Sequence, residues 1–200
     1  MYVYETIIFE VTMAQAQTLN DAQLRRCLKW CQTRRHSTRD TTLFYVSYYA
    51  GLRAKEIAAL IINNVYDEHG AVREDFVLSK SQTKGAKSRT VWINAKLRRQ
   101  LALYYERIPY KAAHLPLFQS QKGGAFSANT MAQLFLNIYR AAGFDGASSH
   151  SGRRTFITEL ASKGVSVRVL AELAGHNQLQ TTQRYIDVNP QQMSAAVELL

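Results

Sequence analysis

Apolar residues recur at helical spacing along most of the chain, which predicts a mainly α-helical protein. In the first convincing helix Leu24, Cys27 and Cys31 share one face, and Thr18 with Asp21 precedes it in the arrangement of a capping box. The same spacing predicts further helices over residues 40–50, 53–60, 97–108, 127–142 and 151–163. Gly51, Gly143 and Gly164 follow three of these ranges, as expected at helix ends.

Three stretches have a strand-like composition and predict one small antiparallel sheet. They run over residues 65–66, 71–78 and 89–93, and a Lys84-Gly85 turn lies between the last two, so Lys84 is expected at a hairpin tip. The expected fold class is therefore mainly α with a small antiparallel β-sheet. No internal repeat and no long Pro- or Ser-rich linker indicates a boundary between domains.

We therefore expect one domain over residues 18–189, with short segments on either side of it. Residues 1–17 are interpreted as an N-terminal extension in which 1–12 alternate like a short strand and Met13 is a candidate native start. Residues 190–200 are expected to form an amphipathic tail helix.

The charge balance favours a polyanionic partner. The chain holds 25 Lys and Arg against 15 Asp and Glu, a net charge of +10, and such a surface attracts nucleic acid. A merely basic soluble protein is the alternative. Candidate contacts to the DNA backbone lie along the first helix, after it and around the hairpin: Arg25, Arg26, Lys29, Arg34, Arg35, Lys80, Lys87 and Arg89. A solvated basic surface would explain the same residues.

Cysteine usage and hydropathy bear on compartment and cofactors. Cys27 and Cys31 lie four apart without the spacing or His partners of a zinc site, which favours a reduced, buried pair and no metal. No apolar run approaches the roughly 18 residues that span a bilayer, and Glu5 and Glu10 are unlike a positively charged signal segment. We expect a cytoplasmic protein with no membrane partner.

Six polar residues stand out within apolar, helix-forming sequence: Arg53, Lys84, His150, Arg153, His176 and Tyr185. Taken singly, each is more often a structural residue than a functional one. Together they supply a nucleophile, two guanidinium groups for phosphate oxygens, and groups that move protons. Transesterification at a phosphodiester needs this set and no metal.

The order of these residues resembles the tyrosine recombinase (phage integrase) family. Residues 50–56, Ala-Gly-Leu-Arg-Ala-Lys-Glu, are similar to its first arginine box, and 173–176, Leu-Ala-Gly-His, followed by Tyr185 nine residues after His176, to its last. Residues 150–153, His-Ser-Gly-Arg, resemble its His-x-x-Arg box, and Lys84 occupies the place of its hairpin lysine. Gly152 departs from the larger apolar residue that is frequent there.

This resemblance implies a site-specific recombinase that cuts DNA through a 3'-phosphotyrosine and consumes no cofactor. It implies that Tyr185 attacks the phosphate that Arg53 and Arg153 bind. Lys84 would protonate the leaving 5'-oxygen, His150 would assist proton transfer and His176 would hydrogen-bond the phosphate. Glu56 would support the surroundings of Arg53.

The resemblance also bears on assembly and leaves alternatives open. Many family members carry an additional DNA-clamping domain before the catalytic one. This chain therefore resembles short single-domain members, or is a catalytic fragment that needs an accessory DNA-binding protein or depends on its own basic face. The family's tail helix implies exchange between subunits and a tetramer on two synapsed duplexes; packing on its own core is the alternative. The competing functions are a DNA-binding architectural protein, against which the complete catalytic set argues, and a relaxing enzyme like a type IB topoisomerase.

Overall fold

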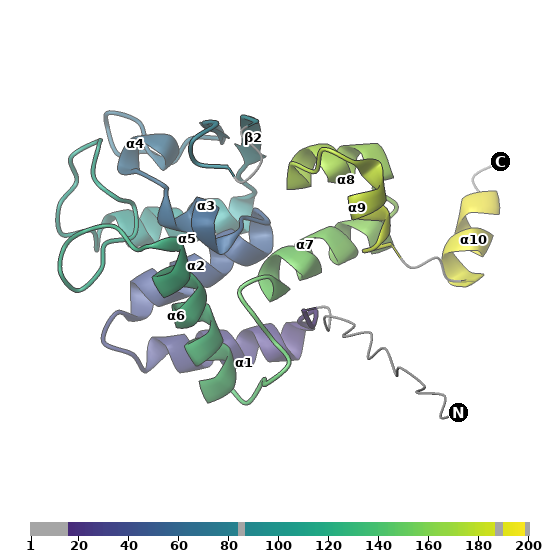
Figure 1. The fold of residues 1–200 in the computed structure, drawn as a ribbon, viewed down its shortest axis with the longest axis horizontal. Coiled ribbons are helices and arrows are strands. Elements are labelled where there is room, and N and C mark those ends of the chain that lie inside the picture. Colours follow the sequence, from purple (N-terminus) through teal and green to yellow (C-terminus); the bar gives the residue numbers. More distant parts are fainter. Residues whose placement is uncertain (1–15, 84–86, 187–189, 199–200) are drawn as a thin grey trace, which may run out of the picture.

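The structure is a computed structural model that describes residues 16–83, 87–186 and 190–198 (Figure 1). The expected strand over residues 1–12, the candidate start at Met13 and the hairpin residue Lys84 lie outside these ranges.

The described residues form helices and one two-stranded sheet. The helices are α1 (Asp21–Gln32), α2 (Ser37–Tyr49), α3 (Ala54–Ala58), α4 (Ile62–Val65), α5 (Ala95–Tyr105), α6 (Ala128–Ala141), α7 (Ser151–Ser162), α8 (Val167–Ala174), α9 (Leu179–Gln183) and α10 (Pro190–Val197). Strands β1 (Asp75–Leu78) and β2 (Arg89–Trp92) pair antiparallel, with Asp75 opposite Trp92. The expected fold class is confirmed.

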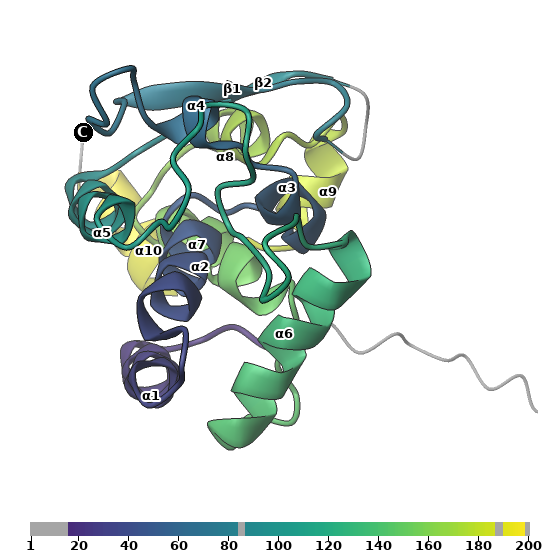
Figure 2. The ribbon, with the colours of Figure 1, turned by 90° about the vertical axis from the view of Figure 1, so that its left-hand side faces the viewer.

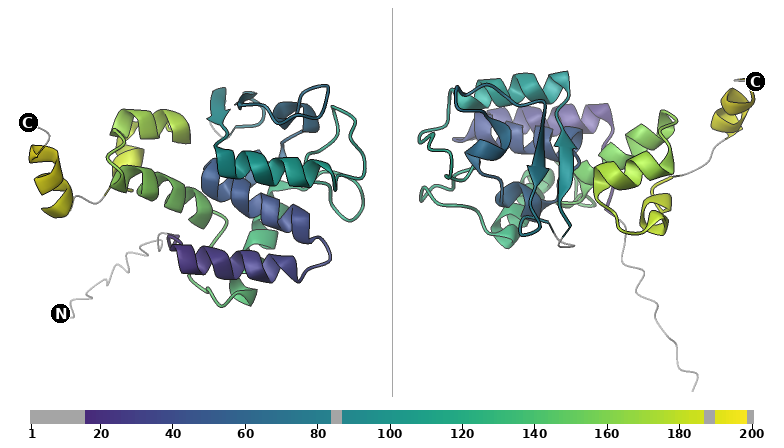
Figure 3. Two further views of the ribbon diagram at one scale, coloured as in Figure 1. Left: turned by 180° about the vertical axis from the view of Figure 1, so that it is seen from behind. Right: turned by 90° about the horizontal axis from the view of Figure 1, so that it is seen from above.

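Helix α2 lies at the centre of the core. It packs against α1, α3, α5 and α7, and α1, α2 and α5 lie side by side in the left panel of Figure 3. Leu43 and Phe44 of α2 are almost fully buried, and the ring of Phe44 contacts those of Phe135 and Tyr139 from α6. Helix α6 contacts α1 and α3 and crosses the end of this layer (Figure 2).

The expected capping box of Thr18 and Asp21 was wrong. The residue that caps the first helix is Asn20, two residues after Thr18. The side chain of Asn20 accepts a hydrogen bond from the backbone N–H of Gln23, and the side chain of Gln23 accepts one from that of Asn20, both at 2.9 Å. Asn at the cap with Gln three residues on satisfies two N–H groups that the helix leaves free. Thr18 and Asp21 also have the required spacing, so sequence spacing alone did not separate the two pairs.

The expected strand at residues 65–66 was also wrong. Val65 ends α4, and Tyr66 forms only an isolated bridge with Val72. Tyr66 is fully buried and its hydroxyl donates to the Leu101 carbonyl at 2.8 Å. Apolar and aromatic residues are typical of both strands and cores, and here they indicated burial.

Helix α7 connects this core to the C-terminal helices. It packs on α2 at one end and on α8 beyond it, so α8 and α9 lie to one side of the body in Figure 1. The start of α3, the start of α7 and the end of α8 thereby come together. These are the three places where the sequence puts its boxes of polar residues.

Gly152 lets α7 approach α2 closely. A Cβ atom at this position would overlap Ser47 Oγ and would lie 3.0 Å from Ser47 Cβ and 3.2 Å from the Ser47 carbonyl carbon. Real Cβ contacts at such distances require the neighbour to move, and the nearest atoms belong to a helix packed in the core. Glycine at this position therefore has a packing reason in this chain.

Substitution of Gly152 by Ala tests this close approach. Overpacking costs about 1–3 kcal/mol, and over most of this range the cost is larger than the gain of about 1 kcal/mol from replacing Gly by Ala in a helix. We expect Gly152→Ala to lower the free energy of unfolding in urea, and an added Ser47→Ala change, which removes the overlapping hydroxyl, to recover part of the loss. Gly124→Ala is the control, since nothing lies within 4 Å of a Cβ there. Equal stability of Gly152→Ala and the parent protein would contradict the packing account.

Candidate active site

Arg53 is held at the start of α3 by the carboxylate of Glu56. The backbone N–H of Arg53 donates to Glu56 Oε2 and its Nη1 donates to Oε1, both at 2.9 Å. The Glu56 side chain is fully buried, whereas that of Arg53 is 21% exposed. The guanidinium is thus anchored on one side and accessible on the other.

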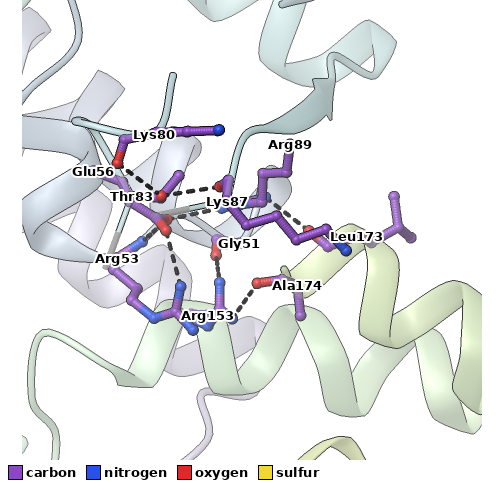
Figure 4. A network of polar contacts seen from close by, with 10 residues as sticks. All are labelled: Gly51, Arg53, Glu56, Lys80, Thr83, Lys87, Arg89, Arg153, Leu173 and Ala174. Carbon is purple, nitrogen blue, oxygen red and sulfur yellow. Dashed lines mark hydrogen bonds and ion pairs between the residues drawn. The ribbon is translucent and has the colours of Figure 1, made fainter. Parts of the chain in front are cut away.

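Arg89, the first residue of β2, donates to the same carboxylate. Its Nη2 lies 2.8 Å from Glu56 Oε2 and its Nη1 donates to the Leu173 carbonyl at 2.8 Å (Figure 4). Burial alone would raise the pKa of Glu56, but the charges of Arg89 and Arg53 and the Arg53 N–H outweigh it, so the pKa is lowered. Glu56 is therefore ionised at neutral pH. Arg89 was expected to contact DNA, but both of its terminal nitrogens bond within the protein and its side chain is only 7% exposed.

Arg153 of α7 is almost completely buried and bonds to backbone at two places. Nη1 donates to the Gly51 carbonyl at 2.8 Å, and Nη2 donates to the Ala174 carbonyl (Figure 4). These bonds join α7 to the turn before α3 and to the last turn of α8. Burial, and next the charge of Arg53, lowers the pKa of Arg153 to about 9, so the guanidinium stays charged at neutral pH.

Among the described residues, Glu56 is the carboxylate that shifts the pKa of Arg153, and it is opposed by the charges of both Arg53 and Arg89, so the site is electropositive. The charges of Arg53 and Arg89 each lower the pKa of Arg153, and only Glu56 and Tyr185 act in the opposite direction among the groups that shift it. Positive charge held in a partly buried place favours a bound anion.

His176 and Tyr185 lie next to this cluster. His176 follows Gly175, which ends α8 in the left-handed conformation at φ 62°; its Nδ1 shares a 2.9 Å hydrogen bond with Thr182 Oγ1. The rings of His176 and Tyr185 stack with centroids 5.9 Å apart. Burial, and next the charge of Arg153, lowers the pKa of His176 to about 4, so its imidazole is neutral at neutral pH.

A pocket of about 370 Å³ brings five of the six predicted catalytic residues together: Arg53, His150, Arg153, His176 and Tyr185. His150 occupies the cap position of α7 and is exposed. The sixth residue, Lys84, lies outside the described residues. Thr83, just before it, closes the base of the hairpin, because its hydroxyl bonds to the carbonyls of Lys80 at 3.2 Å and Lys87 at 3.0 Å.

Two arginines in the pocket were not predicted. Arg154 and Arg184 line it, and the guanidinium carbon of Arg154 lies 5.5 Å from the centroid of the Tyr185 ring. Each is the chain neighbour of a predicted residue, Arg153 or Tyr185. That adjacency was the available signal, but it does not tell which side of a helix a neighbour occupies.

The other predicted DNA contacts vary in exposure. Arg25, Lys29, Arg35, Lys80 and Lys87 are exposed. Arg26 is exposed too, with its guanidinium 5.3 Å from the Phe144 ring centroid. Arg34 is less free, because its Nε donates to buried Asp40 at 2.6 Å and its guanidinium stacks on Trp30. Their contact with DNA stays a prediction.

Cys27 and Cys31 are both buried and unpaired, as expected. Burial raises the pKa of Cys27 to about 11 and that of Cys31 to about 12, so both thiols are protonated and unreactive at neutral pH. In the part of the chain that the structure describes, no three His, Cys, Asp or Glu residues are grouped to hold a metal ion. Nor does that part contain a helix long and apolar enough to cross a membrane.

The low pKa of His176 predicts a pH-dependent stability. An unfolded His takes up a proton near pH 6.5, whereas folded His176 does so only near pH 4, so lowering the pH through this window favours unfolding. The charged groups that shift its pKa are Arg153, Arg53, Arg89 and Glu56.

Urea unfolding at pH 7, 5.5 and 4.5 measures this effect. We expect the parent protein to lose more stability across the series than His176→Gln, which has no titrating ring. His69→Gln, at a side chain 82% exposed, is the control and should keep the parent's pH dependence. Parallel losses for His176→Gln and the parent protein would contradict a neutral, buried His176.

Sequence comparison matches residues 17–192 to the Phage integrase family. A tyrosine recombinase XerC from Rhodospirillum centenum is 31% identical over 162 residues, which cover 80% of this chain and 46% of that protein. A tyrosine recombinase XerA from Pyrococcus furiosus is 29% identical over 161 residues, covering 80% of this chain and 54% of that one. The chain spans about half the length of these relatives.

Solved structures share the fold. The XerA recombinase superposes with a TM-score of 0.71 at 22% identity, over 91% of this chain and 62% of that one. The catalytic domain of bacteriophage HP1 integrase gives 0.64 at 22% identity, over 92% and 95%. XerH recombinase bound to its difH substrate in a post-cleavage complex gives 0.66 at 24% identity, over 90% and 51%. With its family profile matched over most of its length, the chain belongs to the phage integrase family of tyrosine recombinases.

Proposed function

We propose that this chain is a site-specific recombinase that cleaves and rejoins DNA through a covalent bond between Tyr185 and a DNA phosphate. One observation carries the proposal: Tyr185 lines one pocket with Arg53 and Arg153, and the charge of Glu56 offsets only part of the positive charge of these guanidiniums. A tyrosine beside guanidiniums whose charge is only partly neutralised is suited to attack on a phosphodiester.

The proposed step exchanges one phosphate ester for another. The Tyr185 oxygen forms a bond to phosphorus as the bond from phosphorus to the 5'-oxygen breaks, leaving a 3'-phosphotyrosine and a 5'-hydroxyl. Tyr185 gives up its proton and the leaving 5'-oxygen gains one, so protons balance. The ester keeps the bond energy, and the 5'-hydroxyl of another strand reverses the step without ATP.

Arg53 and Arg153 would stabilise the charge that builds up on the non-bridging oxygens. Arg53 is the more accessible of the two, at 21% side-chain exposure, and a guanidinium presents paired donors in the geometry of phosphate oxygens. Removal of one such donor typically costs about 10²–10³ in rate. Glu56 would act beneath them as a support.

The remaining groups would handle hydrogen bonds and protons. If the Nδ1 of neutral His176 accepts from the Thr182 hydroxyl, the ring proton lies on Nε2, which would donate it to a phosphate oxygen. His150 would assist the proton transfer from Tyr185, and Lys84 would donate to the leaving 5'-oxygen. Arg154, next to the Tyr185 ring, would favour the phenolate as it attacks.

Double-stranded DNA is the proposed substrate, and it would place the chain in the cytoplasm. A net charge of +10 and the exposed basic residues of α1 and the hairpin are consistent with backbone contacts. Because the chain spans about half of its relatives, a further DNA-clamping element or accessory protein is part of the proposal.

The main prediction concerns the nucleophile. On nicked DNA carrying a cleavage site, the parent protein should form an adduct that survives denaturation, and Tyr185→Phe should form none while binding the DNA with nearly the same affinity. Tyr110→Phe, at a side chain 66% exposed, is the matched control and should form the adduct normally. Adduct formation by Tyr185→Phe would identify another nucleophile. In a separate assay on supercoiled plasmid, relaxation without recombinant products would favour a topoisomerase.

A tetramer on synapsed DNA is the proposed assembly, with α10 as the exchanged element. Helix α10 stands clear of the other helices in Figures 1 and 3, and its Met193 and Val197 are 55% and 67% exposed. Exposed apolar residues on a terminal helix favour docking elsewhere.

Paired substitution of these two residues tests the assembly. We expect Met193→Ser with Val197→Ser to bind single duplexes normally and to form fewer synaptic complexes, measured as particle mass by light scattering with DNA. Leu103→Ser, at a side chain 59% exposed on α5, should leave synapsis intact. Undiminished synapsis in the double variant would contradict a role for α10.

A further inference from the structure

We propose that Arg89 is a positioning residue that fixes Arg53 and His176 relative to each other, rather than a contact to the DNA backbone. The inference rests on the proposed cleavage reaction and goes beyond it, because that reaction assigns no role to Arg89.

Arg89 joins three segments that are far apart in the sequence. It begins β2, its Nη2 bonds to Glu56 Oε2 in α3, and its Nη1 bonds to the Leu173 carbonyl near the end of α8, each at 2.8 Å (Figure 4). Glu56 in turn holds both the backbone and the side chain of Arg53. The position of one catalytic guanidinium therefore depends on a strand outside the pocket of Tyr185.

The second arm of Arg89 acts on the end of α8. The last carbonyls of a helix lack partners within it and carry partial negative charge. Here the Leu173 carbonyl accepts from Arg89 and the Ala174 carbonyl accepts from Arg153. Two guanidiniums thus cap the helix end from which the chain turns into His176.

Gly175 brings this turn against the Arg89 side chain. A Cβ atom at Gly175 would lie 2.5 Å from Arg89 Cδ and 3.0 Å from its Nε. The aliphatic part of Arg89 therefore packs against the backbone of Gly175, one residue before His176. This contact and the bond to Leu173 constrain the segment that orients the imidazole.

A role as a DNA contact does not fit these surroundings. The side chain is 7% exposed, both terminal nitrogens are engaged, and within the described residues its buried Nε has no hydrogen-bond partner. Lys87, two residues earlier, is exposed and suits a backbone phosphate better. A phosphate contact requires charge, whereas a bridge between a carboxylate and a carbonyl requires the two-armed geometry of a guanidinium.

Arg89→Lys separates the two roles, because it keeps the charge and loses the fork. We expect the rate of adduct formation at saturating DNA to fall by about 10- to 100-fold, as small misplacements of catalytic groups do. DNA affinity and its salt dependence should stay within about twofold of the parent protein, since no phosphate contact is lost. Cleavage by Arg89→Lys within about threefold of the parent would overturn the proposal.

The control is Arg98→Lys on α5. The Arg98 side chain is 41% exposed, and its Nη2 lies 3.9 Å from Oε1 of the exposed Glu74. The same chemical change at this position should therefore leave adduct formation unaltered. The thermal unfolding of both variants shows whether the loss of rate exceeds any loss of folded protein at the assay temperature.

Arg89→Met gives a readout that needs no catalysis. The charge of Arg89 helps to lower the pKa of His176, with Arg153 and Arg53 acting in the same direction and Glu56 against them. We expect the His176 ring resonances, followed by NMR, to titrate at higher pH in Arg89→Met than in the parent protein. An unchanged titration would overturn the placement of Arg89 beside this group.

The binding of Arg89→Met distinguishes the remaining outcomes. A loss of affinity with a salt slope smaller by about one, together with unchanged cleavage at saturation, would make Arg89 a DNA contact. If the parent protein itself forms no adduct, the proposed function fails, but the His176 titration still decides whether Arg89 controls the site. If Arg89→Met does not fold, the comparison of Arg89→Lys with Arg98→Lys decides.

Discussion

The candidate site depends on one buried carboxylate, that of Glu56. A fully buried anion is stable only when it is paired and hydrogen-bonded, and Glu56 meets this need with Arg53, Arg89 and the Arg53 backbone N–H. The same bonds that satisfy the carboxylate determine where the two guanidiniums lie. Stability and active-site geometry therefore share one interaction.

The pairing of Glu56 with Arg53 and Arg89 leaves a net positive charge in the site, and this charge is suited to binding a phosphate. Among the described residues, Arg153 donates to two backbone carbonyls and forms no ion pair with a carboxylate. Its lowered pKa and the low pKa of His176 both reflect burial among neighbouring guanidiniums. An incoming phosphate would relieve this repulsion, and the charge that develops during its transfer would be stabilised more than the ground state.

Much of this arrangement was predictable because the chemistry of the family is carried by residue types at a regular spacing. Apolar periodicity predicted α1, α2, α3, α5, α6 and α7 but not the short helices α4, α8 and α9. Arg53, His150, Arg153, His176 and Tyr185 were predicted and meet in one pocket. Contacts that depend on tertiary packing were missed. Arg89 looked like one basic residue among several around the hairpin, and only the fold reveals that its guanidinium bonds to Glu56 and to the Leu173 carbonyl. Gly152 likewise looked like a weak point until its distance from Ser47 was known.

The most direct measurement is to locate the DNA on the protein by mass spectrometry after trapping the adduct. Arg184 precedes Tyr185 and no Lys or Arg follows it, so trypsin releases residues 185–200 as one peptide that begins with the proposed nucleophile. We predict that, after nuclease digestion, this peptide carries a nucleotide through a phosphate on Tyr185. A nucleotide on any other residue, or on another tryptic peptide, would contradict the account.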